Sequence, residues 1–198
     1  MNKIDRKNKK LIVEDFLRTD SDFVNTHYCM AGVYHEDGKQ VVTDGRYLLV
    51  HHADYDKVLE GKIIKDGKEV EGKYPLYERV IPEDCKLVED SMLTVDVVKS
   101  ISSASKVKSI NKQYAQIVKI VNGDKTLVVL TMAIIKKLEK FLDCYPSAVI
   151  MRHSDDTDNE RSWKAVDKTT GDIFVFMPVY SSKYTHSYDI VSNVVTEL

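Results

Sequence analysis

The stretch VVTDGRYLLVHH, residues 41–52, places two apolar runs on either side of an Asp-Gly pair. Asp-Gly between such runs is a strong hairpin signal, because both residues tolerate the positive φ angles of a tight turn. The stretch therefore predicts strands over residues 40–43 and 47–52, joined by a turn at Asp44-Gly45. A third strand over residues 28–34 should precede them, connected by a turn at 35–38.

Helical and strand patterns repeat along the chain. Apolar residues at helical spacing predict helices at about residues 8–19, 94–108 and 132–143. The other expected elements are a small hairpin at 62–70 and strands at 114–121, 126–130, 148–152, 162–167 and 173–179. Repeated units of a helix with antiparallel strands predict an α+β fold, with helices on one face of curved sheets. We expect one compact domain over residues 1–198, with approximate units at 8–56, 85–125 and 126–180 and a tail at 181–198.

Composition and charge narrow the function classes. The 198 residues are 43% hydrophobic and 30% charged, as in a globular protein with a real core, and a net charge of −2 excludes a generally basic nucleic-acid-binding protein. The charge is segregated: residues 1–10 carry +4 and 95–140 carry +6, whereas 11–94 carry −8 and 141–198 carry −4. Two interpretations remain open. Either basic and acidic material form different faces, or the lysines are only the solvated side of helices.

No motif in the sequence points to catalysis, a metal or a cofactor. The three cysteines are widely spaced without C-x-x-C, which predicts neither a zinc site nor a disulfide framework and favours a reducing compartment. His51 and His52 are adjacent, so on a strand they should face opposite ways. The acidic loop at 154–160 lacks the glycine and the final glutamate of an EF-hand. We expect a cytoplasmic, non-enzymatic protein that has no signal peptide, membrane segment or cofactor.

Three segments carry a family resemblance. Residues 41–48, VVTDGRYL, resemble an A-T-D-G-H-R-L turn; residues 72–82, GKYPLYERVIP, are similar to G-[RK]-F-P-D-Y-R-R-V-[LI]-P; residues 171–179, GDIFVFMPV, resemble a closing strand that ends in V-M-P-M-R. The three patterns that these segments resemble belong to the bacterial DNA polymerase sliding clamp, the ring-forming β subunit of DNA polymerase III. Their order matches over about residues 8–180, which implies a DNA-clamp fold.

The resemblance implies a site for partner peptides. In sliding clamps the three segments build a hydrophobic groove for short clamp-binding peptides of polymerases and repair proteins. Extended peptides suit such a site, because apolar pockets accept alternate side chains. The matching residues here are Thr43, Gly45, Leu48, Pro75, Arg79, Val80, Val175, Met177, Pro178 and Val179.

The resemblance also implies contact with DNA. Helices line the hole of a clamp and present basic side chains to the DNA backbone. The lysines on the polar sides of the two later helices are Lys99, Lys106, Lys108, Lys136, Lys137 and Lys140. Contacts of this kind are directed at phosphates, independent of sequence and sensitive to salt.

The sequence departs from the clamp pattern in several places. Arg46-Tyr47 stands where clamps have His-Arg, which should change polar contacts at the groove edge, and Tyr180 replaces a near-terminal arginine. A half-domain is missing between His52 and Lys73, and 85–125 is short, so closure of a ring, alone or as a homo-oligomer, is in doubt. The leading hypothesis is a clamp-like protein of DNA replication or repair that docks peptides and contacts duplex DNA. The alternative is a clamp mimic or regulatory interaction module that does not bind DNA.

Overall fold

A computed structural model describes residues 9–83, 86–89, 93–104, 117–122, 125–154 and 161–179. Several predicted features lie outside these residues. They are Lys106, Lys108, most of the acidic loop and the tail at 181–198.

Within the described residues, nine strands form one antiparallel sheet in the order β5-β4-β1-β2-β3-β11-β10-β9-β6. Their bounds are β1 Val33–Glu36, β2 Lys39–Thr43, β3 Tyr47–His52, β4 Ile63–Lys65, β5 Lys68–Val70, β6 Leu87–Glu89, β9 Val149–His153, β10 Trp163–Val166 and β11 Ile173–Phe176. Strands β7 (Ile117–Asn122) and β8 (Lys125–Thr131) pair separately. The helices are α1 Ser21–Thr26, α2 Val95–Ala104 and α3 Met132–Cys144, with 3-10 turns η1 Val13–Phe16, η2 Tyr28–Met30, η3 Lys57–Leu59 and η4 Tyr77–Val80.

The pairing of β3 with β11 joins the two halves of the chain. The hairpin β2–β3 comes from the first quarter of the sequence and β11 from the last part described, yet Leu48 lies opposite Val175 and Val50 opposite Ile173. The β4–β5 hairpin extends the sheet beyond β1, in the region where the sequence lacks a clamp half-domain. The α+β class predicted from the sequence is confirmed.

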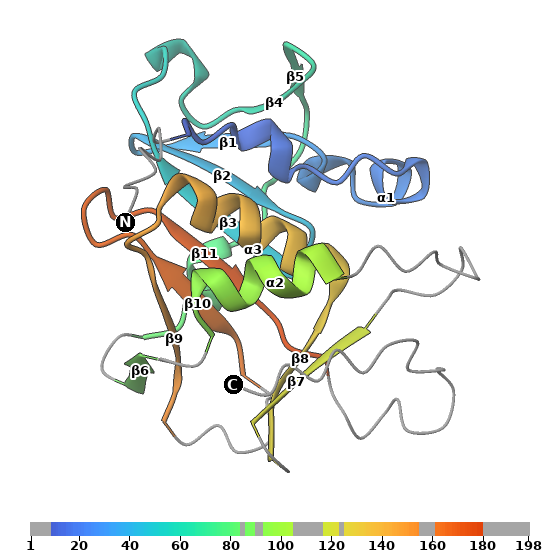
Figure 1. Ribbon diagram of the computed structural model, residues 1–198. Coiled ribbons are helices and arrows are strands. Elements are labelled where there is room, and N and C mark those ends of the chain that lie inside the picture. Colours follow the sequence, from blue (N-terminus) through green and yellow to red (C-terminus); the bar gives the residue numbers. More distant parts are fainter. Residues whose placement is uncertain are drawn as a thin grey trace.

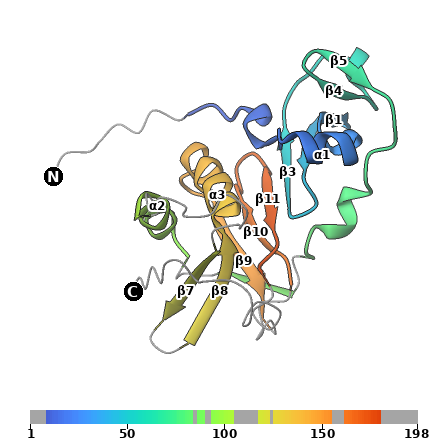
Figure 2. The ribbon, with the colours of Figure 1, turned by 90° about the vertical axis from the view of Figure 1, so that its right-hand side faces the viewer.

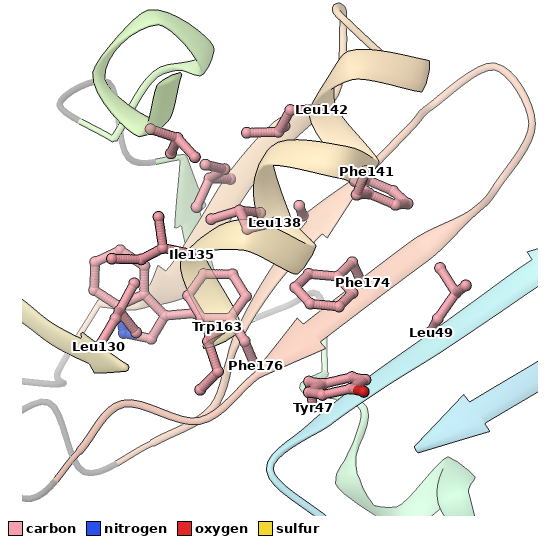
Figure 3. Packing of buried hydrophobic residues seen from close by; sticks show 14 of the residues in the cluster. Tyr47, Leu49, Leu130, Ile135, Leu138, Phe141, Leu142, Trp163, Phe174 and Phe176 are labelled. Atoms are coloured by element: carbon pink, nitrogen blue, oxygen red, sulfur yellow. The ribbon is translucent and has the colours of Figure 1, made fainter. Parts of the chain in front are cut away.

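The two faces of the sheet are covered differently. Figure 2 shows α2 and α3 on one face, and the chain that follows β5 on the other. On the helix face, α3 lies over β10 and β11 (Figure 1). Phe174 and Phe176 of β11 and Trp163 of β10 are fully buried there against Leu138 and Phe141 of α3 (Figure 3). Full burial of each such side chain contributes about 1.5–3 kcal/mol.

The N-terminal segment differs from the prediction of one helix over residues 8–19. The chain makes only the 3-10 turn η1 and then extends at Leu17, whose φ and ψ are −63° and 146°. A new helix, α1, starts after Asp20, whose carboxylate accepts a hydrogen bond from the Phe23 N–H at 3.0 Å. A residue of this type favours a helix start, so the α-helix begins only beyond the expected range. The prediction of a single helix was therefore wrong, although Val13 and Phe16 are buried as their spacing indicated.

The strand predicted over residues 28–34 also begins later, at Val33. Residues before it bond locally: Met30 N–H donates to His27 O at 2.8 Å, and Ala31 N–H donates to Tyr28 O at 3.1 Å. Because these amides are used within the turn η2, they do not pair with a neighbouring strand. The helix predicted at 132–143 and the hairpin around Asp44-Gly45 are confirmed.

A buried carboxylate fixes one end of the β3–β11 junction. Asp172 is fully buried, and its oxygens bond to His51 Nδ1 at 2.5 Å, to His52 N–H at 2.8 Å and to the Tyr145 hydroxyl. Tyr145 is the C-cap of α3, so this one side chain connects β3, the start of β11 and α3. Burial by itself raises the pKa of Asp172, but hydrogen bonds from His51 and Tyr145 hold the pKa below its ordinary value.

We predict that Asp172→Asn lowers the free energy of unfolding at pH 7 by about 2–4 kcal/mol, because it removes the charge from a buried hydrogen-bonded group. A lowered pKa in the folded state means that the carboxylate stabilises the fold above its unfolded-state pKa, and that this contribution is lost as pH falls through the folded value. Urea unfolding should show a difference between wild type and Asp172→Asn that shrinks from pH 5 towards pH 3. The exposed Asp54→Asn is the control. If both variants lowered the free energy of unfolding equally at pH 7, the structural role given to Asp172 would be contradicted.

Candidate functional site

Three of the predicted site residues form a row across the sheet, on the face opposite α2 and α3. In the strand register Thr43 of β2 lies opposite Leu48 of β3, and Leu48 lies opposite Val175 of β11. All three side chains are buried, and Leu48 and Val175 belong to one apolar cluster with Tyr74 and Tyr77. The sheet thus brings the first and the third sequence motif side by side.

The turn between β2 and β3 is held by its own side chains. Thr43 Oγ1 donates to Tyr47 O at 2.6 Å and accepts from Gly45 N–H at 3.1 Å. The Asp44 carboxylate accepts from Arg46 N–H at 2.9 Å, and Gly45 has a φ of +82° that favours glycine. The turn leaves Gly45 and Arg46 exposed, and Arg46 O accepts the Met177 N–H at 2.9 Å. Thr43 and Gly45 therefore have a structural role in addition to their predicted place at the site.

Arg46 and Tyr47, which stand where clamps have His-Arg, lie in different surroundings. Because side chains alternate along a strand, Leu48 faces the row and Tyr47 faces the other side. Tyr47 is buried in the helix-side core, where its hydroxyl donates to Phe16 O. The expectation that both residues change polar contacts at the groove edge was wrong for Tyr47.

The second motif, residues 72–82, crosses this face as a strap. The Tyr74 hydroxyl donates to Val41 O at 3.2 Å, and the Tyr77 hydroxyl donates to a Glu36 oxygen at 3.2 Å. Tyr74 also stacks on Tyr34, with ring centroids 4.7 Å apart. Burial raises the pKa of both Tyr74 and Tyr77, which keeps their hydroxyls protonated as donors. These contacts attach the strap to β1 and β2.

A buried lysine holds the far end of the strap. Lys164 lies on β10 opposite Val175, is 4% exposed, and its Nζ donates to Pro82 O at 3.2 Å. Lys164, Tyr74 and Tyr77 were not predicted from the sequence as residues of the site. A signal for Lys164 exists, since a lysine in the middle of the apolar run Trp163–Val166 breaks the pattern of a buried strand.

The strap and the end of β11 leave apolar side chains in solvent. The exposed fractions are 59% for Leu76, 51% for Val80 and 37% for Met177. Among the other predicted residues, Pro75 and Arg79 are exposed on the strap, and Pro178 is buried. Val179 is half-buried, and its N–H donates to Val129 O of β8 at 2.8 Å, so the chain there continues towards the second sheet. We call the row together with the exposed Leu76, Val80 and Met177 the docking face.

The lysines expected on the helices are mostly engaged with neighbouring groups. Lys99 of α2 pairs with Asp143 of α3 at 2.5 Å, and Lys140 pairs with Asp15 at 3.1 Å. Lys137 donates to Asp15 O, and its Nζ lies 5.7 Å from the centre of the Phe16 ring.

Burial lowers the pKa of Lys137, as expected for an ammonium group that has partly lost its water. Lys136 is exposed. The two helices do lie side by side, so the structure brings these lysines to one side of the sheet (Figure 1).

Two further features are absent from the part of the chain that the structure describes. In the described part of the chain, no three side chains of His, Cys, Asp or Glu are grouped as metal ligands would be. None of the described helices has the length and apolar character needed to cross a lipid bilayer.

The fold is similar to that of DNA sliding clamps. The β clamp of Bartonella birtlesii, solved with bound griselimycin, matches with a TM-score of 0.56 and 17% identity over 84% of this chain and 61% of that chain. The C. crescentus β clamp matches with a TM-score of 0.56 and 16% identity, over 82% and 60%. The β subunit of Borrelia burgdorferi, solved with a natural product, matches with a TM-score of 0.52 and 12% identity, over 85% and 60%.

The chain therefore spans about 60% of the length of these clamps, and at such identities the likeness establishes the fold. No protein-family model and no curated protein matches the sequence.

We predict that Tyr77→Phe loosens the strap, because it removes the hydroxyl that bonds to Glu36. Loss of one such hydrogen bond should lower the free energy needed to open the strap by about 1 kcal/mol. Hydrogen exchange should show faster exchange at the strap amides of Arg79 and Ile81 than in wild type, with β3 amides unchanged. Equal exchange at the strap in both proteins would show that Tyr77 does not hold it.

Proposed function

We propose that this protein is a non-enzymatic, clamp-like protein of DNA replication or repair that docks extended apolar peptides of partner proteins on the docking face. The observation that carries the proposal is the row Thr43–Leu48–Val175 beneath the strap. The row comes from the first and the third of the segments whose sequences resemble the peptide-binding segments of sliding clamps, and the second segment is the strap that covers it. The shared fold supports the same conclusion.

The chemistry of the face suits an extended peptide. Buried Leu48 and Val175 support the strap from beneath, and the exposed Leu76, Val80 and Met177 offer apolar contact to a ligand side chain. Methionine adapts to ligands of different shape because its side chain is flexible and polarizable. The exposed Arg46 and Arg79 provide hydrogen-bond donors at the edge.

We predict that a fluorescently labelled clamp-binding peptide of a bacterial polymerase binds this protein, and that Met177→Ala and Val80→Ala each weaken binding about three- to tenfold through lost apolar contact. Fluorescence anisotropy measures the affinity. Val58→Ala is the matched control, because Val58 is 62% exposed on η3 but outside the docking face.

Leu48→Ala should abolish binding. Because Leu48 is 1% exposed, its truncation also lowers the free energy of unfolding by about 2–5 kcal/mol. The binding result for this variant must therefore be compared with its unfolding curve. Absence of peptide binding at high micromolar protein would refute the proposal. So would equal affinities of the wild type, Met177→Ala and Val80→Ala.

The second candidate is a clamp mimic that docks the same peptides without contacting DNA. The ion pairs of Lys99 and Lys140 and the half-buried position of Lys137 favour it, because paired lysines release few counterions when a phosphate approaches. We therefore predict that Lys136→Glu with Lys137→Glu changes retention on duplex DNA by less than about twofold. A steep loss of retention on this charge reversal would instead support DNA contact through α3.

A further inference from the structure

The hairpin β4–β5 carries two lysines that stand directly opposite each other. Its register pairs Lys65 of β4 with Lys68 of β5, on either side of the turn at residues 66–67. Like charges in directly opposite positions of two paired strands repel each other. Within the described residues neither ammonium group forms an ion pair, and the hairpin acid Glu69 is already paired with Lys62 at 3.2 Å. An anion bound between the two lysines would relieve their repulsion.

The two lysines lie on the same face of the sheet as the docking face. Ile63 of β4 and Val70 of β5 pack with the apolar cluster beneath the strap. Because side chains alternate along a strand, Lys65, two residues from Ile63, and Lys68, two residues from Val70, face the same way. Glu69 lies between them in the alternation and faces the other side of the sheet. Lys68 is exposed and Lys65 is half-buried.

The lysines also lie at the same end of the strands as the row of the docking face. The register pairs Tyr34 of β1 with Val41 of β2 on one side and with Ile63 of β4 on the other. Since β2 and β4 are both antiparallel to β1, they run in the same direction. Two residues further along each strand stand Thr43, which belongs to the row, and Lys65. The row, continued past the start of β1, therefore leads to the two lysines.

A peptide in extended conformation can reach from the row to the lysines. The order of strands places β4 three positions and β5 four positions from β3. At about 4.8 Å between strands, these spans are about 14 and 19 Å, which about four to six extended residues cover. Close to the start of β1, Tyr28 of η2 lies against Gly72 of the strap and is 54% exposed, so it offers an aromatic contact along this path.

We propose that a partner docked on this face carries acidic side chains about four to six residues from the apolar residue that docks, and that Lys65 and Lys68 bind these carboxylates. The inference rests on the proposed peptide docking and adds the charge of the partner to it. Charged groups at the rim of an interface act mainly on specificity and association rate, and salt screens them. The hairpin stands where the sequence lacks a clamp half-domain, so this contact is a feature of the present chain.

The test compares fluorescent peptides on the full chain by anisotropy. One peptide is the clamp-binding core alone, and the others extend it, beyond a spacer of about four residues, by Asp-Asp or by Asn-Asn. Each extension is made at the N-terminal and at the C-terminal end, which covers both directions of a peptide across the sheet. The variant is Lys65→Gln with Lys68→Gln. Its matched control is Lys10→Gln with Lys136→Gln, which removes two exposed lysines from the N-terminal segment and α3.

In one of the two directions, the Asp-Asp peptide should bind the wild type about three- to tenfold more tightly than the Asn-Asn peptide at about 50 mM salt. This advantage should disappear in Lys65→Gln with Lys68→Gln and at about 500 mM salt, whereas the control variant should keep it. The charge-reversed Lys65→Glu with Lys68→Glu should instead prefer an extension of two lysines. A reversed preference cannot result from a loss of folding.

Equal affinities of the Asp-Asp and Asn-Asn peptides for the wild type, in both directions, would overturn the inference and leave peptide docking intact if the core peptide binds. If the core peptide itself does not bind at high micromolar protein, docking is overturned and this inference with it. A labelled DNA duplex that binds the wild type but binds Lys65→Gln with Lys68→Gln about tenfold more weakly would show that the two lysines meet phosphates. That result would also overturn the assignment to an acidic partner.

Discussion

The pairing of β3 with β11 is the constraint on which the rest of the structure depends. It connects strands from opposite ends of the described chain, so neither half can complete its sheet without the other. The pairing is closed at one end by the buried Asp172 and at the other by the bond from Met177 N–H to Arg46 O. Contacts so distant in sequence are costly to form, and they are maintained by burial on both faces of the sheet.

The same pairing builds two different surfaces because side chains alternate along each strand. Phe174 and Phe176 of β11 point to the helices, whereas Val175 between them points to the docking face. On β3, Tyr47 and Leu48 divide in the same way. A slip of one residue in the register would exchange the two sets and place aromatic rings under the strap. The core beneath α3 thus fixes the register, and the register aligns Leu48 with Val175.

Much of the fold could be predicted from local patterns, whereas most of the site could not. Periodicity gave α3 and the β2–β3 hairpin, because both depend on neighbours in the sequence. The alignment of Leu48 with Val175 could be predicted only through the resemblance to clamps. The structural roles of Lys164 and Asp172 were not predicted. A charged side chain is stable in the core only with hydrogen-bonding partners, and here those partners, Pro82 O and His51, are distant in sequence. The N-terminal helix failed for a local reason, since the chain makes only a 3-10 turn within the expected range and the α-helix begins after Asp20, beyond that range.

The net charge of a segment did not predict the electrostatic potential at the surface that the folded segment presents. The basic stretch 95–140 suggested a positive helical surface, yet Lys99 pairs with Asp143 and Lys140 with Asp15, two acids that come from other segments. Ion pairs of this kind contribute little to stability at an exposed surface, but they still cancel the field that a phosphate would meet. The charge of a segment is therefore a poor guide to where a polyanion would bind, because folding places acidic side chains of other segments beside these lysines.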